Sequence, residues 1–340
     1  MKKKLFCVIA LVSLMFFSLM VSEGISAEKP IELRLTTSVT SIHPTFLILQ
    51  EFAGEVNKRT NGRVQITVFP SGTLNPPFES YNAVVSGIAQ IGAVPVGYSA
   101  QVMPLSKLFG DALRMMGNST EAANAWKIAL ERIPEMKKEF SEVHLLWVYA
   151  TIPMGLHTTK EVKKAEDLKG LILRVPPGTE PVAKAWGVSP MSVPIADLYV
   201  SLQKNVINGF VGGSEGLKTN RLAEQVKYTA GLNMIHGLQW VAVNKKVWDS
   251  LSPDIQKTIT EVSAWITPKH NRTVDRVGEE VDQFAASQGT KIVKIDKAEL
   301  EKIHKLARPT WEKIAASLEA KGKPGKKVLQ EVDRIVAEKK

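Results

Sequence analysis

Residues 31–50 read IELRLTTSVTSIHPTFLILQ, and they hold the first strand and the first helix of a repeating pattern. Ile31, Leu33 and Leu35 alternate with polar residues, which is typical of a strand with one buried face. After the turn at residues 41–45, apolar residues recur at helical spacing. This stretch therefore predicts a strand followed by a helix.

The same order of elements continues to residue 94. Residues 64–68 alternate again, residues 77–89 have one apolar helical face, and residues 91–94 are apolar. Strand–helix–strand–helix–strand implies parallel strands with right-handed crossovers. The predicted fold class is therefore α/β, with an open sheet.

A second unit of the same kind follows the first. We expect strands at residues 144–150, 171–175, 191–193 and 209–211, with helices at 180–186 and 195–204. Two units of this size predict two domains of similar architecture.

Later segments connect the two units. Residues 238–244 form an apolar strand that can return to the first sheet. A helix that starts at Ser252-Pro253 keeps an apolar stripe to Phe284 and would run about 50 Å, so it has to cross both domains, with a bend at Pro268. Residues 291–340 predict a strand and basic helices, broken at Pro309 and at 322–325.

These segments predict the domain boundaries. The first domain comprises residues 28–150 plus about 237–267, and the second comprises residues 151–236 plus about 268–340. Because ligands of open α/β sheets bind at the carboxyl ends of strands, we expect the ligand cleft between the domains.

The composition excludes several classes of protein. Of the 340 residues, 44% are hydrophobic and 23% are charged, which excludes a disordered chain, a collagen-like fibre and a multi-span membrane protein. The net charge of +10 is concentrated in part in the last twenty residues, which carry +4. We interpret this excess as a solvated basic face and do not expect nucleic-acid binding.

The N-terminus resembles an export signal. Lys2-Lys3-Lys4 precedes an apolar run from Leu5 to Val21, and the segment ends at Ala27. These features predict a signal peptide over residues 1–27 and a periplasmic protein, with a retained anchor helix as the alternative. Cys7 is the only cysteine, so a chain cleaved after Ala27 has no thiol for disulfides or metal thiolates.

Signatures of catalysis are weak. The six histidines show no metal-ligand spacing, and no nucleotide-binding glycine motif is present, so we expect no metal and no cofactor. Residues 212–216 match the G-x-S-x-G pattern of a hydrolase nucleophile. A hydrolase using Ser214, with Asp249 and His270 or His304, is therefore one alternative, and a glycine-rich turn is the other.

A stronger signal is DLKGLILRVPPG at residues 167–178. It places Arg174 near the carboxyl end of a strand, just before a turn that opens a helix. A guanidinium can clamp a carboxylate with two charge-assisted hydrogen bonds, and the following helix N-terminus also favours an anion. From the spacing alone, Arg174 is equally well a strand-end residue paired with an acidic neighbour.

Several motifs together resemble one family. D-L-K-G-L-x-x-R-V-P stands at residues 167–176, F-P-S-G-x-L at 69–74, and a variant of G-x-A-D-I-G at 87–92, with Gln90 in place of aspartate. Residues 197–209 resemble E-V-Y-x-A-L-Q-x-G-x-V-D-G, and residues 244–251 resemble N-x-x-x-W-x-x-L. The chain is similar to the solute-binding proteins of TRAP transporters, the DctP-like family, from about residue 30 to 290.

This resemblance implies a two-domain periplasmic-binding-protein (Venus-flytrap) architecture with a long domain-spanning helix. It implies a non-enzymatic protein that closes on a small organic acid and delivers it to the small and large integral membrane subunits of a TRAP transporter. The family's carboxylate-clamping arginine falls on Arg174. The other cleft positions that we expect to contact substrate are His43, Tyr98, Phe210, Trp240 and Gly212.

The chain departs from the family pattern at three places. Residues 155–158 replace a second arginine found in many members, residues 211–213 replace Glu-Asn-Pro, and Pro177 stands where some members have a polar ligand contact. Fewer polar groups suggest a monocarboxylate with an apolar or aromatic body, or a keto acid. A binding protein of another importer and a ligand-sensing subunit remain alternatives.

Overall fold

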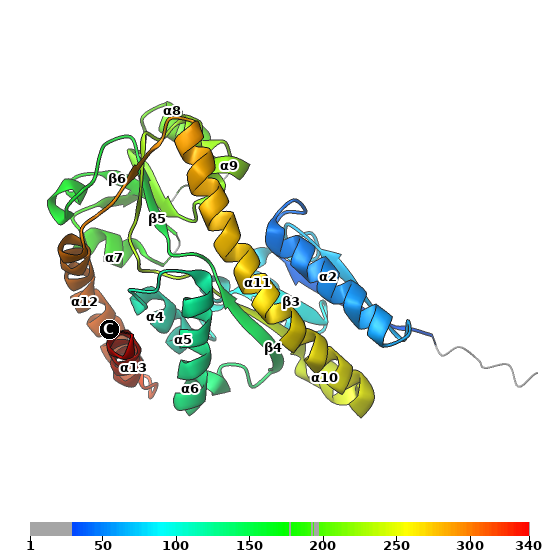
Figure 1. Ribbon diagram of the computed structural model, residues 1–340. Coiled ribbons are helices and arrows are strands. Elements are labelled where there is room, and N and C mark those ends of the chain that lie inside the picture. Colours follow the sequence, from blue (N-terminus) through cyan, green and yellow to red (C-terminus); the bar gives the residue numbers. More distant parts are fainter. Residues whose placement is uncertain (1–28, 177, 192, 194–196, 340) are drawn as a thin grey trace, which may run out of the picture.

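The computed structural model describes residues 29–176, 178–191, 193 and 197–339. The predicted signal peptide over residues 1–27 lies outside this part of the chain. Within the described ranges, no helix combines the length and the apolar character needed to cross a bilayer. The described chain folds into two sheets with helices around them, and a long helix, α11, runs alongside both (Figure 1).

The first sheet is built mainly from the N-terminal part of the chain. Its strands are β1 (Ile31–Thr37), β2 (Val64–Phe69), β3 (Ile91–Pro95), β4 (Val143–Ala150) and β10 (Leu238–Asn244). The order is β2-β1-β3-β10-β4, with β1 parallel to β2 and β3. The predicted parallel pairing and the return of residues 238–244 to this sheet are confirmed; β10 is antiparallel to both neighbours.

The second sheet has the order β11-β9-β5-β8-β6-β7. Its strands are β5 (Gly155–Thr158), β6 (Ile172–Arg174), β7 (Ser189–Met191), β8 (Gly209–Gly212), β9 (Tyr228–Gly231) and β11 (Lys291–Val293). The sequence did not predict β5 or β9. Each has only four residues, GLHT and YTAG, which is too short for alternation to stand out. The α/β fold class with two sheets is confirmed.

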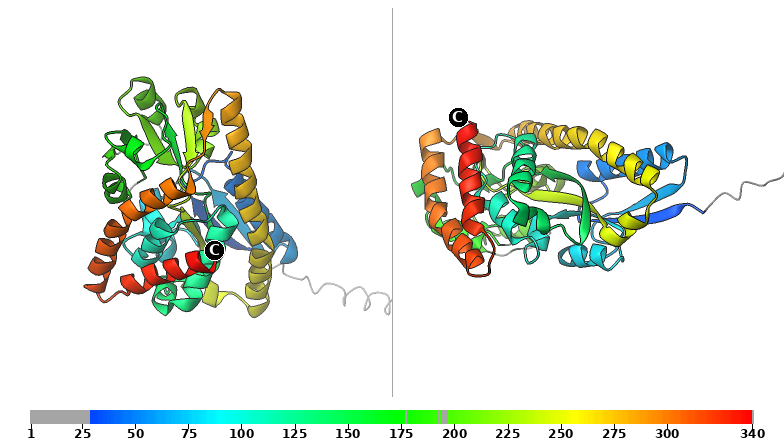
Figure 2. Two further views of the ribbon diagram at one scale, coloured as in Figure 1. Left: turned by 60° about the vertical axis from the view of Figure 1, so that its left-hand side comes forward. Right: turned by 90° about the horizontal axis from the view of Figure 1, so that it is seen from below.

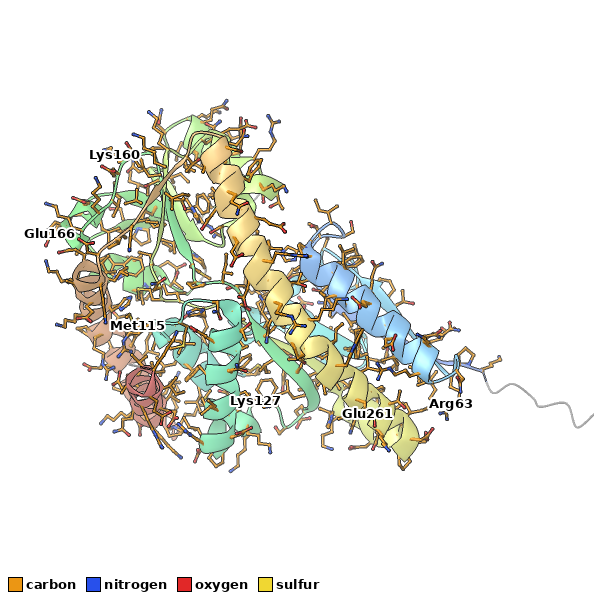
Figure 3. All side chains as sticks on the ribbon, in the orientation of Figure 1. Arg63, Met115, Lys127, Lys160, Glu166 and Glu261 are labelled. Atoms are coloured by element: carbon orange, nitrogen blue, oxygen red, sulfur yellow. The ribbon has the colours of Figure 1, made fainter. Side chains whose placement is uncertain are left out.

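Helices cover both sheets. They are α2 (Pro44–Arg59), α3 (Ser80–Val85), α4 (Pro104–Ala112), α5 (Ser119–Arg132), α6 (Pro134–Lys138), α7 (Glu180–Ala185), α8 (Leu198–Gln203), α9 (Glu215–Thr219), α10 (Lys245–Ser250), α11 (Pro253–Ser287), α12 (Lys297–Glu319) and α13 (Gly325–Glu338). Charged side chains such as Lys127, Lys160 and Glu166 are exposed and point outward (Figure 3). These three charged side chains are thus solvated.

The alternation along β10 divides the core of the first sheet in two. Val241 and Val243 face a cluster shared with α2 and α11. Trp240 and Ala242 face a second cluster, shared with α3, α4 and α5. Because successive side chains of a strand point to opposite faces, β10 is buried on both. Burial on both faces explains why its sequence is apolar almost throughout.

The long helix α11 connects the two sheets, as the sequence predicts. It contacts α2, β4 and α5 on one side of the molecule and α9 and β11 on the other (Figures 1 and 2). It continues through Pro268 as one helix. Pro268 leaves the carbonyl of Ala264 without its usual donor, but both residues are exposed, so water can satisfy that group.

The segments that cross between the sheets pack together beneath α11. Thr151, just after β4, donates its N–H to the carbonyl of Gly237 at 3.0 Å, and the N–H of Gly237 donates to Thr151 Oγ1 at 3.0 Å. At Gly278 of α11, a Cβ would lie 3.1 Å from a methyl carbon of Ile152. The absence of a side chain at Gly278 therefore lets the helix approach the crossing closely.

The C-terminal helices differ from the prediction. Helix α12 is not broken at Pro309, because this residue and the carbonyl it frees, at Lys305, are both exposed. The predicted interruption at residues 322–325 is confirmed, since α12 ends at Glu319 and α13 begins at Gly325.

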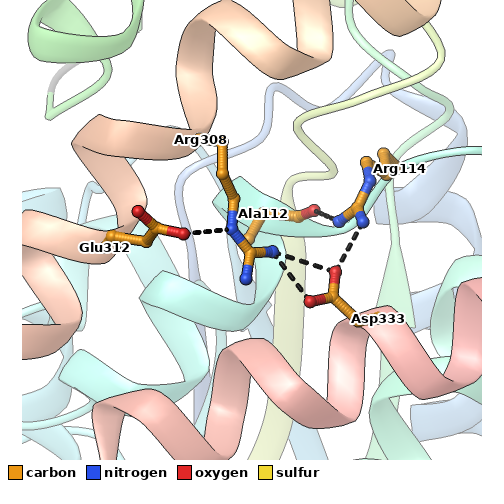
Figure 4. A network of polar contacts seen from close by, with 5 residues as sticks. All are labelled: Ala112, Arg114, Arg308, Glu312 and Asp333. Atoms are coloured by element: carbon orange, nitrogen blue, oxygen red, sulfur yellow. Dashed lines mark hydrogen bonds and ion pairs between the residues drawn. The ribbon is translucent and has the colours of Figure 1, made fainter.

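Helix α13 packs on α4, while α12 contacts both α4 and α7 (Figure 2). Asp333 on α13 accepts hydrogen bonds from Arg114, just after α4, and from Arg308 on α12 (Figure 4). The C-terminal helices thus contact helices of both predicted domains, and the assignment of residues 268–340 to the second domain stays a prediction.

Three buried histidines link folding to pH. Burial lowers the pKa of His157 and His236 to about 4 and that of His270 to about 3. The folded state holds them neutral, whereas the unfolded chain protonates them near pH 6.5. Stability that is fully present above about pH 6.5 is therefore lost as the pH falls toward 4. Between pH 6.5 and its folded-state pKa, each histidine lowers the free energy of unfolding by about 1.4 kcal/mol for every pH unit that the pH falls.

We predict that His270→Gln lowers stability at pH 7 but makes it less sensitive to acid. His270 accepts from Trp147 Nε1 at 3.3 Å and packs on Tyr149 between α11 and β4, so its loss weakens this contact. The free energy of unfolding, measured by urea denaturation at pH 7, 6 and 5, should fall less steeply with decreasing pH than in the wild type, by about 1.4 kcal/mol per pH unit. His144→Gln is the comparison: burial also lowers the pKa of this partly exposed histidine, so we expect the slope to change less than in His270→Gln. An unchanged slope in His270→Gln would contradict this assignment.

Candidate ligand-binding site

Two cavities lie between the sheets and meet at Arg174. The α4 cavity, of about 270 Å³, lies between the α4 side of the first sheet and the ends of β6 and β8. The α9 cavity, of about 310 Å³, lies between the loop after β1 and helix α9. Arg174, Gly212 and Gly213 line both. These residues are at the carboxyl ends of β6 and β8, where ligands of open α/β sheets bind.

Arg174 is the last residue of β6 and pairs in register with Phe210 of β8. Its Nε donates to the carbonyl of Val193 at 3.3 Å, and its Nη1 lies 3.9 Å from the point where a Cβ of Gly212 would be. Burial lowers the pKa of the guanidinium, while nearby Tyr98 and Glu180 oppose that effect. No acidic side chain within the described residues forms an ion pair with it.

The strand pair β5–β8 supports this corner. His157 lies fully buried beneath Phe210, with ring centroids 4.6 Å apart. One ring nitrogen is 3.3 Å from the carbonyl oxygen of Gly212, and the other is 2.8 Å from Thr229 Oγ1. Residues 155–158, where the resemblance led us to expect a second arginine, thus place a neutral histidine under the site.

Three further predicted residues line the cavities. His43 is the N-cap of α2, accepts from Thr45 N at 3.1 Å and lines the α9 cavity, with its pKa lowered by burial. Tyr98 lines the α4 cavity and packs edge-on against Phe78 at 4.6 Å. Phe210 lines the α9 cavity, although only 2% of it is exposed.

Trp240 has to be removed from the predicted set. It is fully buried and packs edge-on against Tyr81 at 6.0 Å, on the α3 side of β10. Its neighbours Leu238 and Gln239 line the α4 cavity instead. Trp240 is on the same face of β10 as Leu238 but two residues further along the strand, where α3 covers it, and the sequence does not show how far along the strand the cavity extends.

A second correction concerns the helix after Arg174. Helix α7 has six residues and begins with Glu180, an acid. Its short length and its first residue make it a poor anion site, so the anion preference at this place rests on Arg174. Pro177, which marked a departure from the family pattern, lies outside the described residues.

Sequence reasoning missed three charged residues of the cavities. Lys107 and Asp111 line the α4 cavity and form an ion pair on α4. Burial raises the pKa of Asp111, and the charge of Lys107 opposes that rise. Glu215, at the start of α9, lines the α9 cavity, and burial raises its pKa. The only sign of Lys107 and Asp111 in the sequence was a pair of opposite charges four residues apart in the largely apolar segment PLSKLFGDA.

The residues considered for a hydrolase lie apart. Ser214 is buried and lines a different cavity, which Asp275 of α11 also lines. Asp249 forms an exposed ion pair on α10, and His270 lies between α11 and β4. His304, on α12, lies 3.1 Å from the backbone carbonyl oxygen of Leu232. The acid and the histidines proposed for Ser214 therefore do not meet it.

We predict that a serine-directed phosphonate probe does not label the purified protein. Without a base, the Ser214 hydroxyl is a weak nucleophile. Intact-mass spectrometry after incubation should show unmodified chain, and Ser214→Ala serves as the control. Labelling that disappears in Ser214→Ala would restore the hydrolase alternative.

Two sheets with crossing segments and ligand-sized cavities between them define the class of two-domain binding proteins. Comparison with known proteins identifies the family. The model of the bacterial extracellular solute-binding protein family 7, DctP, matches residues 35–318, and the chain belongs to this family. The family comprises periplasmic proteins that bind substrates and work with TRAP transporters.

Individual relatives agree with the family assignment. The chain is 26% identical to a monocarboxylate 2-oxoacid-binding periplasmic protein of Nostoc, over 83% of this chain and 79% of that protein. A TRAP solute-binding protein of Desulfovibrio salexigens has a TM-score of 0.81 at 26% identity, covering 90% of this chain and 95% of that one. One from Rhodoferax ferrireducens, in complex with copurified benzoate, has a TM-score of 0.79 at 21% identity, covering 91% and 98%.

We predict that Glu215→Gln stabilises the unliganded protein at pH 7. Because burial raises the pKa of Glu215 in the folded state, ionising it weakens the fold, and stability is lost as the pH rises through that pKa. The gain in melting temperature should shrink as the pH is lowered to 4. Glu224→Gln is the control, because Arg221 lowers the pKa of this exposed carboxylate. A lower melting temperature for Glu215→Gln at pH 7 would contradict the prediction.

Proposed function

We propose that this chain captures a small organic acid between its two sheets, with the carboxylate paired to Arg174. The observation that carries the proposal is a partly buried guanidinium, without an acidic partner among the described residues, where two cavities meet. A buried cation without a counter-ion is unfavourable, and a carboxylate supplies the missing charge together with two hydrogen-bond acceptors.

The surroundings of Arg174 favour an acid with an apolar body. The α4 cavity is lined by apolar side chains such as Val96, Met154 and Leu238. Tyr98, His43, Phe210 and Gly212 are the further contacts that we propose for the bound acid. The acids named for the Nostoc and Rhodoferax proteins, a 2-oxoacid monocarboxylate and benzoate, support this ligand class.

Delivery completes the proposed function. The two domains close on the acid around the crossing segments, and the closed form presents it to the small and large membrane subunits of a TRAP transporter. The family assignment supports this role, and export through the leader at residues 1–27 would bring the protein to the periplasm. A neighbouring pair of genes for two membrane subunits supports this route, whereas a gene for an ATPase points to another importer.

We predict that Arg174→Ala weakens binding of acids about 100-fold or more and leaves the fold intact. The variant removes two charge-assisted hydrogen bonds but also a desolvated cation, so its melting temperature without ligand should not fall. Arg174→Lys keeps the charge without the fork and should lose about tenfold.

Isothermal titration calorimetry with benzoate, mandelate and 2-oxoacids measures these affinities. Thermal shift provides the first screen, because a ligand at 100 times its Kd stabilises by about 2.7 kcal/mol. Arg221→Ala is the matched control, because this arginine follows α9 and its side chain is exposed. Near-normal affinity in Arg174→Ala would refute the assignment of the carboxylate clamp.

A further inference from the structure

An ion pair faces the ligand cavity from the side opposite Arg174. Lys107 and Asp111 are one turn apart on α4, and both line the α4 cavity. Their side chains are only 19% and 10% exposed, unlike an ordinary surface pair of this spacing. Lys107 Nζ lies 3.7 Å from the point where a Cβ of Gly178 would be, on the turn after Arg174. The ammonium thus reaches across to the other wall.

The charges in this cavity can be counted. Arg174 and the Lys107–Asp111 ion pair supply the charged side chains among the residues that line it, since burial lowers the pKa of His236 to about 4 and keeps that residue neutral at pH 7. Lys107 is neutralised by Asp111, so one positive charge remains. Glu180 on α7 is close enough to influence both Arg174 and Asp111, which further reduces the attraction for a second negative charge.

We infer that Asp111, by pairing with Lys107, makes the α4 cavity selective for acids with one negative charge. This inference rests on the proposed function and names the substrate class of the same site. A monoanion neutralises Arg174 and leaves no unpaired charge. A dicarboxylate leaves its second carboxylate beside Asp111, where Lys107 is already paired.

Within the described part of the chain, Asp111 neutralises Lys107 and no other side chain. Among the described residues, its only side-chain hydrogen bond is the one from Lys107. Replacing the carboxylate by an amide would release the Lys107 ammonium toward the cavity, next to Arg174. Two cations would then face the ligand, and a dicarboxylate would match them.

The test compares matched acids on the full mature chain. Benzoate against phthalate, isophthalate and terephthalate varies the second carboxylate on one ring, and butyrate against succinate does so on an aliphatic chain. In titration calorimetry, the wild type should bind the better of the two monoacids at least tenfold more tightly than the dicarboxylates matched to it. In Asp111→Asn, the ratio of dicarboxylate to monocarboxylate affinity should rise about tenfold or more, as expected for one uncompensated charge in a partly buried site.

Two further variants separate charge from shape. Lys107→Met combined with Asp111→Leu removes the pair but keeps the single charge of Arg174, so the preference for monoacids should survive even if overall affinity falls. Asp249→Asn, in the exposed pair with Lys245 on α10, is the control and should change nothing. Circular dichroism and melting temperature check that each variant folds.

The outcomes are distinguishable. A shift in the ratio in Asp111→Asn alone supports the inference. An unchanged ratio, with monoacid binding that still depends on Arg174, overturns the inference and leaves the proposed function intact. A wild type that binds a dicarboxylate more tightly also overturns the inference alone. If no acid binds the folded wild type, both the proposed function and the inference fail.

Discussion

The structure depends on one crossing point between its two sheets. The segments after β4 and before β10 bind each other there through Thr151 and Gly237, and α11 lies over them at Gly278. Close approach at this point leaves no room for larger side chains. It also fixes where the ends of β6 and β8 stand relative to α4. The two cavities that share Arg174 exist because this crossing joins the sheets along one side and leaves space between their strand ends.

The fold was predictable from the sequence where its elements are long and one-sided. Alternation at Leu33 and Leu35 and at residues 64–68, and the stripe of α11, reflect burial of a single face, although Ile31 at the start of β1 is exposed. The failures have the opposite cause. Strands β5 and β9 are too short to show a period. Pro309 was expected to break a helix, but α12 continues through it because the carbonyl that Pro309 frees is exposed to water. Sequence reports the preference of a residue, whereas exposure decides its energetic effect.

The same limit applies to the site. The spacing alone left Arg174 equally well a strand-end residue paired with an acid, and the resemblance to the family made it the predicted carboxylate clamp. Trp240 was misplaced, because it shares the face of Leu238, which lines the α4 cavity, but lies two residues further along β10, where α3 covers it. Lys107 and Asp111 look like a common surface pair at helical spacing, and only their burial against a cavity distinguishes them. Contacts between the two halves of the chain are what the sequence could not supply.

Charge and closure are connected in this arrangement. Burial lowers the pKa of the Arg174 guanidinium, so further removal of water by closing the domains would oppose its charged form. An acid bound to Arg174 reverses that penalty, because the neutralised pair tolerates a low dielectric better than the lone cation does. On the proposed function, the ligand's charge therefore makes closure favourable. In this proposal, the partly buried Arg174 is the residue that makes closure depend on a bound acid.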